Sequence, residues 1–80
     1  MRLPRDVSGE ALARALGRLG YVVTRQTGSH MRVTTRENGE HHVTIPAHRV
    51  LRVGTLAAIL SDVAAHCDLT RDALIDRLFG

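Results

Sequence analysis

The chain has 80 residues, enough for one small domain with a modest core, and we expect residues 1–80 to form a single unit. No apolar stretch is long enough to cross a bilayer, and the first residues lack the apolar run of a signal peptide. The single cysteine, Cys67, excludes an internal disulfide framework and favours a reducing, cytoplasmic location.

Charge is distributed unevenly along the chain. All 11 basic residues are arginines, and the formal net charge is +3. Residues 1–52 carry nine arginines against four acidic residues, whereas residues 53–80 carry two arginines against four aspartates. We therefore expect the first two-thirds of the chain to contact anionic ligands. A solvated arginine-rich surface would have the same composition, so composition leaves both interpretations open.

The first predicted element is a helix over residues 9–19. Ser8 is a favoured N-cap residue, and Gly20 tolerates the left-handed conformation that ends helices. Apolar residues between them recur at helical spacing and form one stripe: Leu12, Ala15, Leu16 and Leu19.

Two β-rich runs follow, at residues 21–26 and 30–35, and the tripeptide Thr27-Gly28-Ser29 between them predicts a hairpin. A second turn at residues 37–40 contains Asn-Gly, which is the strongest short hairpin signal. The third predicted strand covers residues 41–45 and ends before Pro46.

Apolar spacing predicts a second helix over residues 55–66, and Thr70 can cap a short final helix at about residues 70–79. Its expected anchors are Leu74, Ile75, Leu78 and Phe79. The predicted fold class is α+β, with the order α-β-β-β-α and an extra C-terminal helix. We expect the helices to pack on one face of a three-stranded antiparallel sheet.

Strand alternation predicts which side chains remain exposed. If Thr27-Gly28 is a two-residue turn, Arg25 pairs with His30, and Val23 pairs with Arg32. One face then carries Tyr21, Val23, Arg25, His30, Arg32 and Thr34. The more apolar face carries Val22, Thr24, Met31 and Val33, joined by Val43 and Ile45 from the third strand. We therefore expect the helices to cover the second face and His30 to remain exposed.

The tripeptide Gly28-Ser29-His30 is the most informative feature of the sequence. It places an imidazole at a tight turn, with Arg25 and Arg32 nearby. Histidine can accept and donate a proton near neutral pH, and arginine binds phosphate oxygens in bidentate fashion. This combination predicts proton transfer on a phosphate-bearing substrate.

Four ordered blocks of sequence resemble the HicA family of small bacterial toxins. The blocks are Leu16-Gly17-Arg18-Leu19-Gly20-Tyr21, Arg25-Gln26-Thr27-Gly28-Ser29-His30, Val43-Thr44-Ile45-Pro46-Ala47-His48 and Val53-Gly54-Thr55-Leu56-Ala57-Ala58-Ile59-Leu60. The resemblance extends over roughly residues 8–79. Two positions depart from the usual pattern: Met31 stands where another histidine or an aromatic residue often follows, and Thr27 where many members have a basic residue.

The resemblance implies a double-stranded-RNA-binding-like fold and metal-independent cleavage of mRNA, with no cofactor. It implies that His30 is the essential histidine and that a HicB-like antitoxin covers the site. Arg25 and Arg32 are then the expected phosphate ligands, while Gly28 and Ser29 are further expected RNA contacts. We expect a monomer when the chain is alone and a hetero-oligomer with the antitoxin.

Two other classes of function remain open from the sequence. The chain could be an RNA-binding module of the same fold without cleavage activity, or an interaction protein whose open sheet face binds another chain. A metal site built from His41, His42 and His48 is disfavoured, because adjacent strand residues point to opposite faces. Cys67 is interpreted as a small apolar filler.

Overall fold

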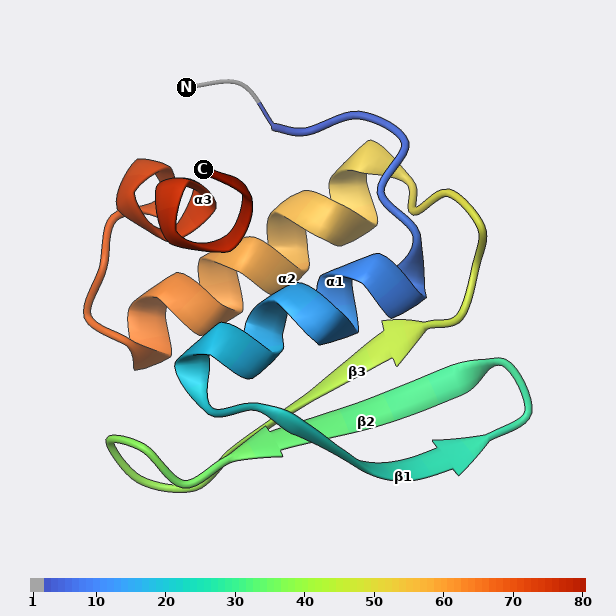
Figure 1. The fold of residues 1–80 in the computed structure, drawn as a ribbon, viewed down its shortest axis with the longest axis horizontal. Helices are drawn as coiled ribbons and strands as arrows, with labels where there is room; N and C mark the ends of the chain where they lie inside the picture. Colours follow the sequence, from blue (N-terminus) through green and yellow to red (C-terminus); the bar gives the residue numbers. More distant parts are fainter. Residues whose placement is uncertain (1–2) are drawn as a thin grey trace.

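A computed structural model describes residues 3–80 of the chain. Its elements are, in order, α1 (Gly9–Leu16), the 3-10 helix η1 (Gly17–Leu19), β1 (Val22–Thr27), β2 (His30–Thr35), β3 (His41–Pro46), α2 (Val53–His66) and α3 (Arg71–Phe79). Helices α1 and α2 cover one face of the sheet, and α3 packs against both of them (Figure 1). The predicted α+β class, with its α-β-β-β-α order and extra C-terminal helix, is confirmed.

The first helix is capped as predicted. The Ser8 side-chain oxygen accepts a hydrogen bond from the Ala11 N–H at 3.0 Å. The α-helical part ends at Leu16, and η1 continues to Leu19 with tighter 3-10 geometry. Gly20 then takes the left-handed conformation, with φ +85, and directs the chain into the sheet.

The first hairpin turns one residue later than predicted. The antiparallel sheet has the order β1-β2-β3, and its first turn consists of Gly28 and Ser29. Thr27 therefore pairs with His30, and Arg25 pairs with Arg32. The predicted pairing of Arg25 with His30 is wrong, because Gly28 has φ +53 and occupies the first of the two turn positions, where hairpins favour glycine.

β1 contains a β-bulge at Thr24, so its residues face other sides of the sheet than predicted. The register shifts between Val23 and Arg25, so that Val23 pairs with Val33 of the core. Val22 lies on the other face, where 61% of it is exposed. The prediction that Val22 and Thr24 face the helices while Val23 lies on the open side is therefore wrong. The extra residue at the bulge interrupts the regular alternation of faces along β1.

The core lies between the sheet and the helices. The sheet contributes four residues that were predicted to be covered: Met31, Val33, Val43 and Ile45. The helices contribute apolar residues at helical spacing, the most buried being Leu12, Leu16, Leu60, Val63 and Leu74. Tyr21, predicted on the exposed face, is only 1% exposed, because it precedes β1 and points toward α2 on the helix side of the sheet.

The C-terminal half differs from the prediction at its boundaries. β3 extends through Pro46, and α2 begins at Val53, two residues before the predicted start. Thr70 caps α3 by accepting a hydrogen bond from the Ala73 N–H at 3.1 Å. Phe79 is 36% exposed and is a weaker anchor than predicted. Within residues 3–80, no helix is both long enough and apolar enough to span a membrane.

Two glycines of α1 and η1 provide a test of how tightly the first helix packs on the sheet. A Cβ at Gly9 would overlap the carbonyl oxygen of Pro46, whereas a Cβ at Gly17 would meet no atom within 4 Å. We expect Gly9→Ala to lower the free energy of unfolding by about 1–3 kcal/mol, since backbone lies on both sides of the clash. We expect Gly17→Ala to raise it by about 0.5–1 kcal/mol. Urea unfolding of both variants measures the difference, and effects of the same sign would contradict this close approach.

Candidate functional site

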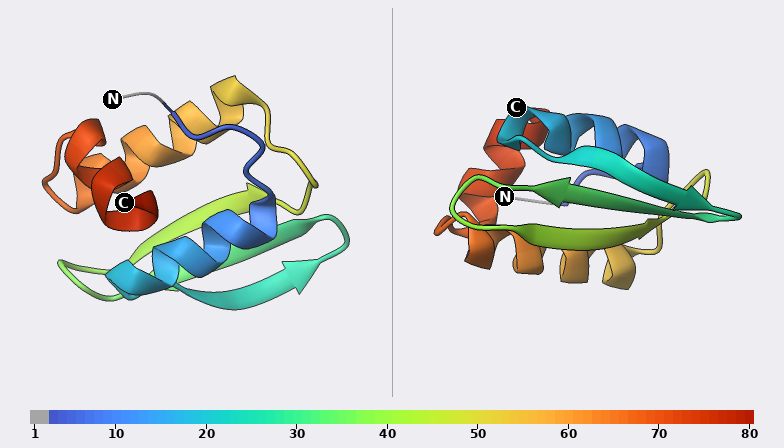
Figure 2. Two further views of the ribbon diagram at one scale, coloured as in Figure 1. Left: turned by 45° about the horizontal axis from the view of Figure 1, so that its top comes forward. Right: turned by 90° about the horizontal axis from the view of Figure 1, so that it is seen from below.

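The outer face of the sheet is free of helices. Seen from below, the three strands lie in front of the helices, and no described element covers them (Figure 2). Alternation along β2 places His30, Arg32 and Thr34 on this side of the sheet. We call the outer side of the sheet the open face.

His30 stands at one end of the open face. It is exposed, begins β2 and pairs with Thr27 on one side and with Pro46 on the other. The backbone of its turn is held in place, because the Ser29 carbonyl accepts a hydrogen bond from the Ala47 N–H at 2.6 Å. The imidazole is thus presented to solvent from a turn that is anchored to the segment after β3.

Arg25 and Arg32 are direct cross-strand partners on the open face. Like charges placed opposite each other destabilise a sheet, and no carboxylate among residues 3–80 forms an ion pair with either guanidinium. Arg32 lies two residues along β2 from His30, a rise of about 7 Å. An anion bound between the two arginines would relieve their repulsion and would lie beside the imidazole.

A chain of hydrogen bonds crosses the open face beyond the arginines. The Thr24 hydroxyl donates to the Arg32 carbonyl at 3.3 Å. Thr24 Oγ1 and Thr34 Oγ1 are 2.9 Å apart, and Thr34 Oγ1 is 2.7 Å from His42 Nδ1. The bulge at Thr24 makes this contact possible, because it turns the Thr24 side chain toward β2 on the open face.

These residues line a shallow hollow of about 640 Å³. Its polar lining includes the two cross-strand arginines together with Thr34, Arg36 and His42, and Glu37 and Glu40 also contribute. His30 is not part of this lining. The hollow and the histidine are therefore neighbouring parts of one basic surface.

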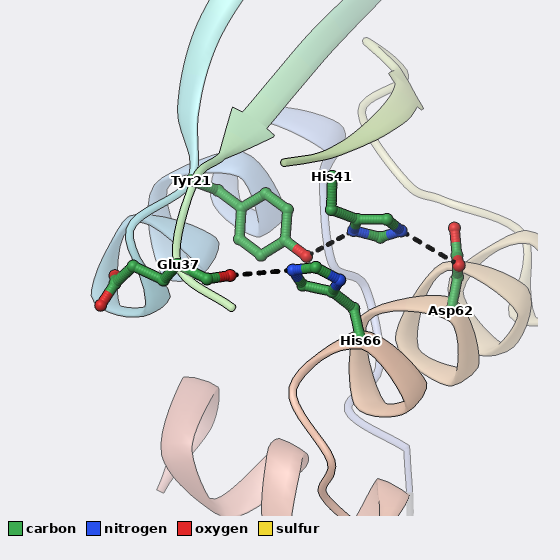
Figure 3. Close-up of polar contacts among 5 residues, drawn as sticks. All are labelled: Tyr21, Glu37, His41, Asp62 and His66. Atoms are coloured by element: carbon green, nitrogen blue, oxygen red, sulfur yellow. Dashed lines mark hydrogen bonds and ion pairs between the residues drawn. The ribbon is translucent and has the colours of Figure 1, made fainter. Parts of the chain in front are cut away.

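A second polar cluster lies on the helix side of the sheet and joins Tyr21, His41, Asp62, His66 and Glu37 (Figure 3). The Tyr21 hydroxyl is 2.7 Å from His41 Nδ1, and His41 Nε2 is 3.2 Å from an Asp62 carboxylate oxygen. The His66 ring stacks on the His41 ring with centroids 4.4 Å apart, and its Nε2 donates to the Glu37 carbonyl at 2.9 Å.

Hydrogen-bond directions in this cluster follow from its carboxylate. Asp62 can only accept when it is ionised, so His41 donates from Nε2 and accepts the Tyr21 O–H at Nδ1. Burial raises the pKa of Tyr21 well above its usual range, and the charges of Cys67 and Asp62 add to this effect. Tyr21 is inaccessible to substrate, so we interpret the cluster as a structural connection between β1, β3 and α2.

The pKa of Tyr21 can be tested directly, because it is the only tyrosine and there is no tryptophan. Its folded pKa lies above the unfolded value, so its contribution to stability is complete below about pH 10 and is lost as the pH rises further. We expect tyrosinate absorbance to appear only together with alkaline unfolding, followed by circular dichroism. Ionisation near pH 10 in a chain that is still folded would contradict the buried hydroxyl.

The remaining histidines and the cysteine do not form a metal centre. His41 and His42 face opposite sides of the sheet, as alternation predicted, and His48 is exposed in the segment after β3. No group of three His, Cys, Asp or Glu side chains within the described part of the chain is placed to hold a metal ion. Burial raises the pKa of the Cys67 thiol, which keeps it protonated and poorly nucleophilic.

The structure brings together three of the residues singled out in the sequence, namely His30, Arg25 and Arg32, with Gly28 and Ser29 forming the adjoining turn. Sequence reasoning missed the chain from Thr24 through Thr34 to His42. The period-2 alternation of β3 could have placed His42 on the open face. Nothing in the sequence signals the bulge that turns Thr24 toward it.

Fold and site together define a small α+β domain with two helices behind a three-stranded sheet and a basic, histidine-bearing face in front. A family model described as "HicA toxin of bacterial toxin-antitoxin" matches residues 9–64. The chain belongs to the HicA toxin family, which assigns it the role of toxin in a toxin–antitoxin pair. No curated protein and no solved structure gives a significant match.

Proposed function

We propose that the chain is a metal-independent endoribonuclease that cleaves mRNA, and that a HicB-like antitoxin inhibits it. Membership of the HicA toxin family supports the toxin role and a partner of the antitoxin kind. The observation that carries the proposal is the exposed His30 beside Arg25 and Arg32, which have no ion-pair partner among residues 3–80, on a face that no described helix covers.

RNA supplies its own nucleophile, which limits what the protein must provide. His30 accepts the proton of a ribose 2′-hydroxyl as that oxygen attacks the adjacent phosphorus. The bond from phosphorus to the 5′-oxygen breaks, and water protonates the leaving oxygen. The products are a 2′,3′-cyclic phosphate and a free 5′-hydroxyl, so the reaction needs no cofactor.

The two arginines act on the charge that develops at phosphorus. Guanidinium groups on both sides of a phosphate can hold its oxygens with charge-assisted hydrogen bonds. A positioned general base contributes typically about 10²- to 10⁴-fold in rate. One histidine cannot serve as base and acid for both protons at once, so we expect slow turnover. Ser29 orients the imidazole or the RNA, and Gly28 permits the turn that presents them.

The open face is also where the antitoxin must act. A partner that covers His30 and the arginines would exclude RNA by occupying the same surface. We propose a monomer for the free toxin, a hetero-oligomer with the HicB-like partner and a cytoplasmic location, where mRNA is available.

The decisive test is RNA cleavage by the unsubstituted chain and by His30→Ala, each with a chelator present. We expect the unsubstituted chain to leave 2′,3′-cyclic phosphate ends and His30→Ala to lose at least about 100-fold in rate. His48→Ala is the matched control and should cut normally. If His30→Ala cuts normally, the catalytic assignment is wrong. If neither chain cuts while both bind RNA, the chain is an RNA-binding module.

The arginine assignment predicts the salt dependence of RNA binding. Each phosphate contact to a single strand contributes about 0.7 to the slope of log K against log salt. We expect Arg25→Gln and Arg32→Gln each to reduce the slope by about that amount. Arg71→Gln, on α3 behind the sheet, removes the same charge and should leave the slope unchanged. If the Arg25→Gln and Arg32→Gln slopes equal that of Arg71→Gln, the assignment of Arg25 and Arg32 as phosphate ligands is wrong.

A further inference from the structure

The hollow of about 640 Å³ on the open face has three parts of different chemistry. The part nearest the exposed histidine is the cross-strand pair of Arg25 and Arg32. The middle part includes the Val22 side chain, which lies one row further along the sheet and is 61% exposed. Gly20 and Glu37 line the far end, beyond the ends of the strands. A cationic end, an apolar side chain and a carboxylate thus follow one another across one surface.

The backbone of Glu37 is held at both its donor and its acceptor. The Glu37 N–H donates to Thr35 Oγ1 at 3.1 Å, and the Glu37 carbonyl accepts from His66 Nε2 at 2.9 Å. A Cβ at Gly20 would overlap the Glu37 carboxylate, so this carboxylate lies against a residue that has no side chain. Among residues 3–80, no ion pair neutralises it. The sheet therefore presents a held, charged acceptor at the far end of the hollow.

A carboxylate at this place disfavours a phosphate. An ionised carboxylate can only accept hydrogen bonds, and it repels an anion. Phosphates have ligands in Arg25 and Arg32 at the other end of the hollow. The far end suits a neutral group with N–H donors, and the exposed Val22 beside it suits an apolar surface. A nucleobase combines both properties, and Arg36, which also lines the hollow, offers a guanidinium plane on which a base can stack.

The bases differ in what they offer to a carboxylate. Cytosine, adenine and guanine each carry an exocyclic amino group, whereas uracil carries carbonyl oxygens in its place. A carboxylate accepts from an amino group and repels a carbonyl oxygen. The second carboxylate of the hollow, Glu40, has a partner of its own, because its Oε1 lies 3.5 Å from His42 Nε2. Glu37 is therefore the residue that can distinguish the bases.

The proposed reaction determines which nucleotide occupies the hollow. His30 accepts the proton of the 2′-hydroxyl on the 5′ side of the cut, so that ribose lies beside His30. Arg25 and Arg32 hold the phosphate, and the hollow continues from them away from His30. The nucleotide on the 3′ side of the cut, which keeps the free 5′-hydroxyl, is therefore the one that extends into the hollow.

We propose that the hollow is a base-binding subsite for the nucleotide on the 3′ side of the cut, and that Glu37 is its specificity-determining residue. The Glu37 carboxylate accepts a hydrogen bond from an exocyclic amino group and disfavours uracil. The inference rests on the RNA-directed function proposed above and adds a preference among bases.

The experiment compares the binding of oligocytidylate and oligouridylate of equal length at one salt concentration, because the two bases are similar in size and differ in the amino group. All chains carry His30→Ala so that the RNA stays intact. The reference chain should prefer oligocytidylate by about 3- to 10-fold, as expected for one hydrogen bond. Glu37→Gln should bring this ratio close to one, because a glutamine amide can donate to the uracil oxygen as well as accept from the amino group.

A control variant separates this contact from a general effect of charge. Glu10→Gln removes the same charge from α1, on the helix side of the sheet, and should leave the ratio unchanged. Removing a negative charge strengthens the binding of both RNAs alike, so the ratio isolates the base contact. Urea unfolding confirms that each variant is folded.

Cleavage provides a second readout, which tests where the base lies. The chain with His30 intact cuts an RNA of mixed sequence, and the fragments that carry a 5′-hydroxyl are sequenced. Uracil should be depleted as their first base, and Glu37→Gln should abolish the depletion. Depletion of uracil on the 5′ side of the cut instead would overturn the placement of the 3′ nucleotide in the hollow.

The possible outcomes of the binding experiment have distinct meanings. If the reference chain binds both RNAs equally, or if Glu37→Gln leaves the ratio unchanged, the base contact is overturned. If the ratio falls as expected but the unsubstituted chain does not cut RNA, the nuclease proposal fails while the selection by Glu37 is upheld. If the chain cuts RNA and the ratio does not respond, only the selection is overturned.

Discussion

The central strand β2 has hydrogen-bonded neighbours on both sides and helices on only one face, and the rest of the molecule depends on this asymmetry. Side chains point alternately to its two faces, so a residue that faces the helices places its neighbour on the open face. Met31 and Val33 bind the sheet to the helices, and the same pleat turns His30 and Arg32 outward. The register of β2 therefore determines both which side chains form the core and which form the candidate site. A shift of β2 by one residue would turn Arg32 toward the helices and Met31 and Val33 toward solvent.

The polar cluster around Tyr21 gives that register a second support. Tyr21 directly precedes β1, His41 begins β3 and Asp62 belongs to α2, so two hydrogen bonds connect three separate segments. Polar groups that are removed from water must find partners, and a shifted strand would leave the tyrosine hydroxyl without one. Apolar packing alone would tolerate small displacements more easily. Apolar packing is non-directional, whereas the hydrogen bonds of the cluster require defined positions of the strands and of α2.

Much of the fold could be predicted because local signals agreed with one another. The cap at Ser8, the glycine stop at Gly20 and the alternation of β2 all survive in the structure. The errors concentrate on β1. The position of its turn depends on which residue takes a positive φ, and the sequence is compatible with a turn at Thr27-Gly28 or at Gly28-Ser29. The bulge at Thr24 then reversed the faces of Val22 and Val23, because it depends on hydrogen bonds to β2 that the sequence of β1 does not reveal. The contact between His42 and Thr34 was missed for a related reason, since it depends on how β3 pairs with β2.

The same bulge bears on how copies of the chain behave toward one another. β1 is an outer strand of the sheet, and a regular outer strand offers a row of unpaired backbone groups to any other strand that approaches. A bulge interrupts that row and increases the local twist, while Arg25 next to it adds charge. Because Val22 is 61% and Val23 is 49% exposed, a flat β1 would be an aggregation-prone edge strand. We therefore expect the irregular β1 to oppose pairing between the sheets of two copies, although its side chains are partly apolar.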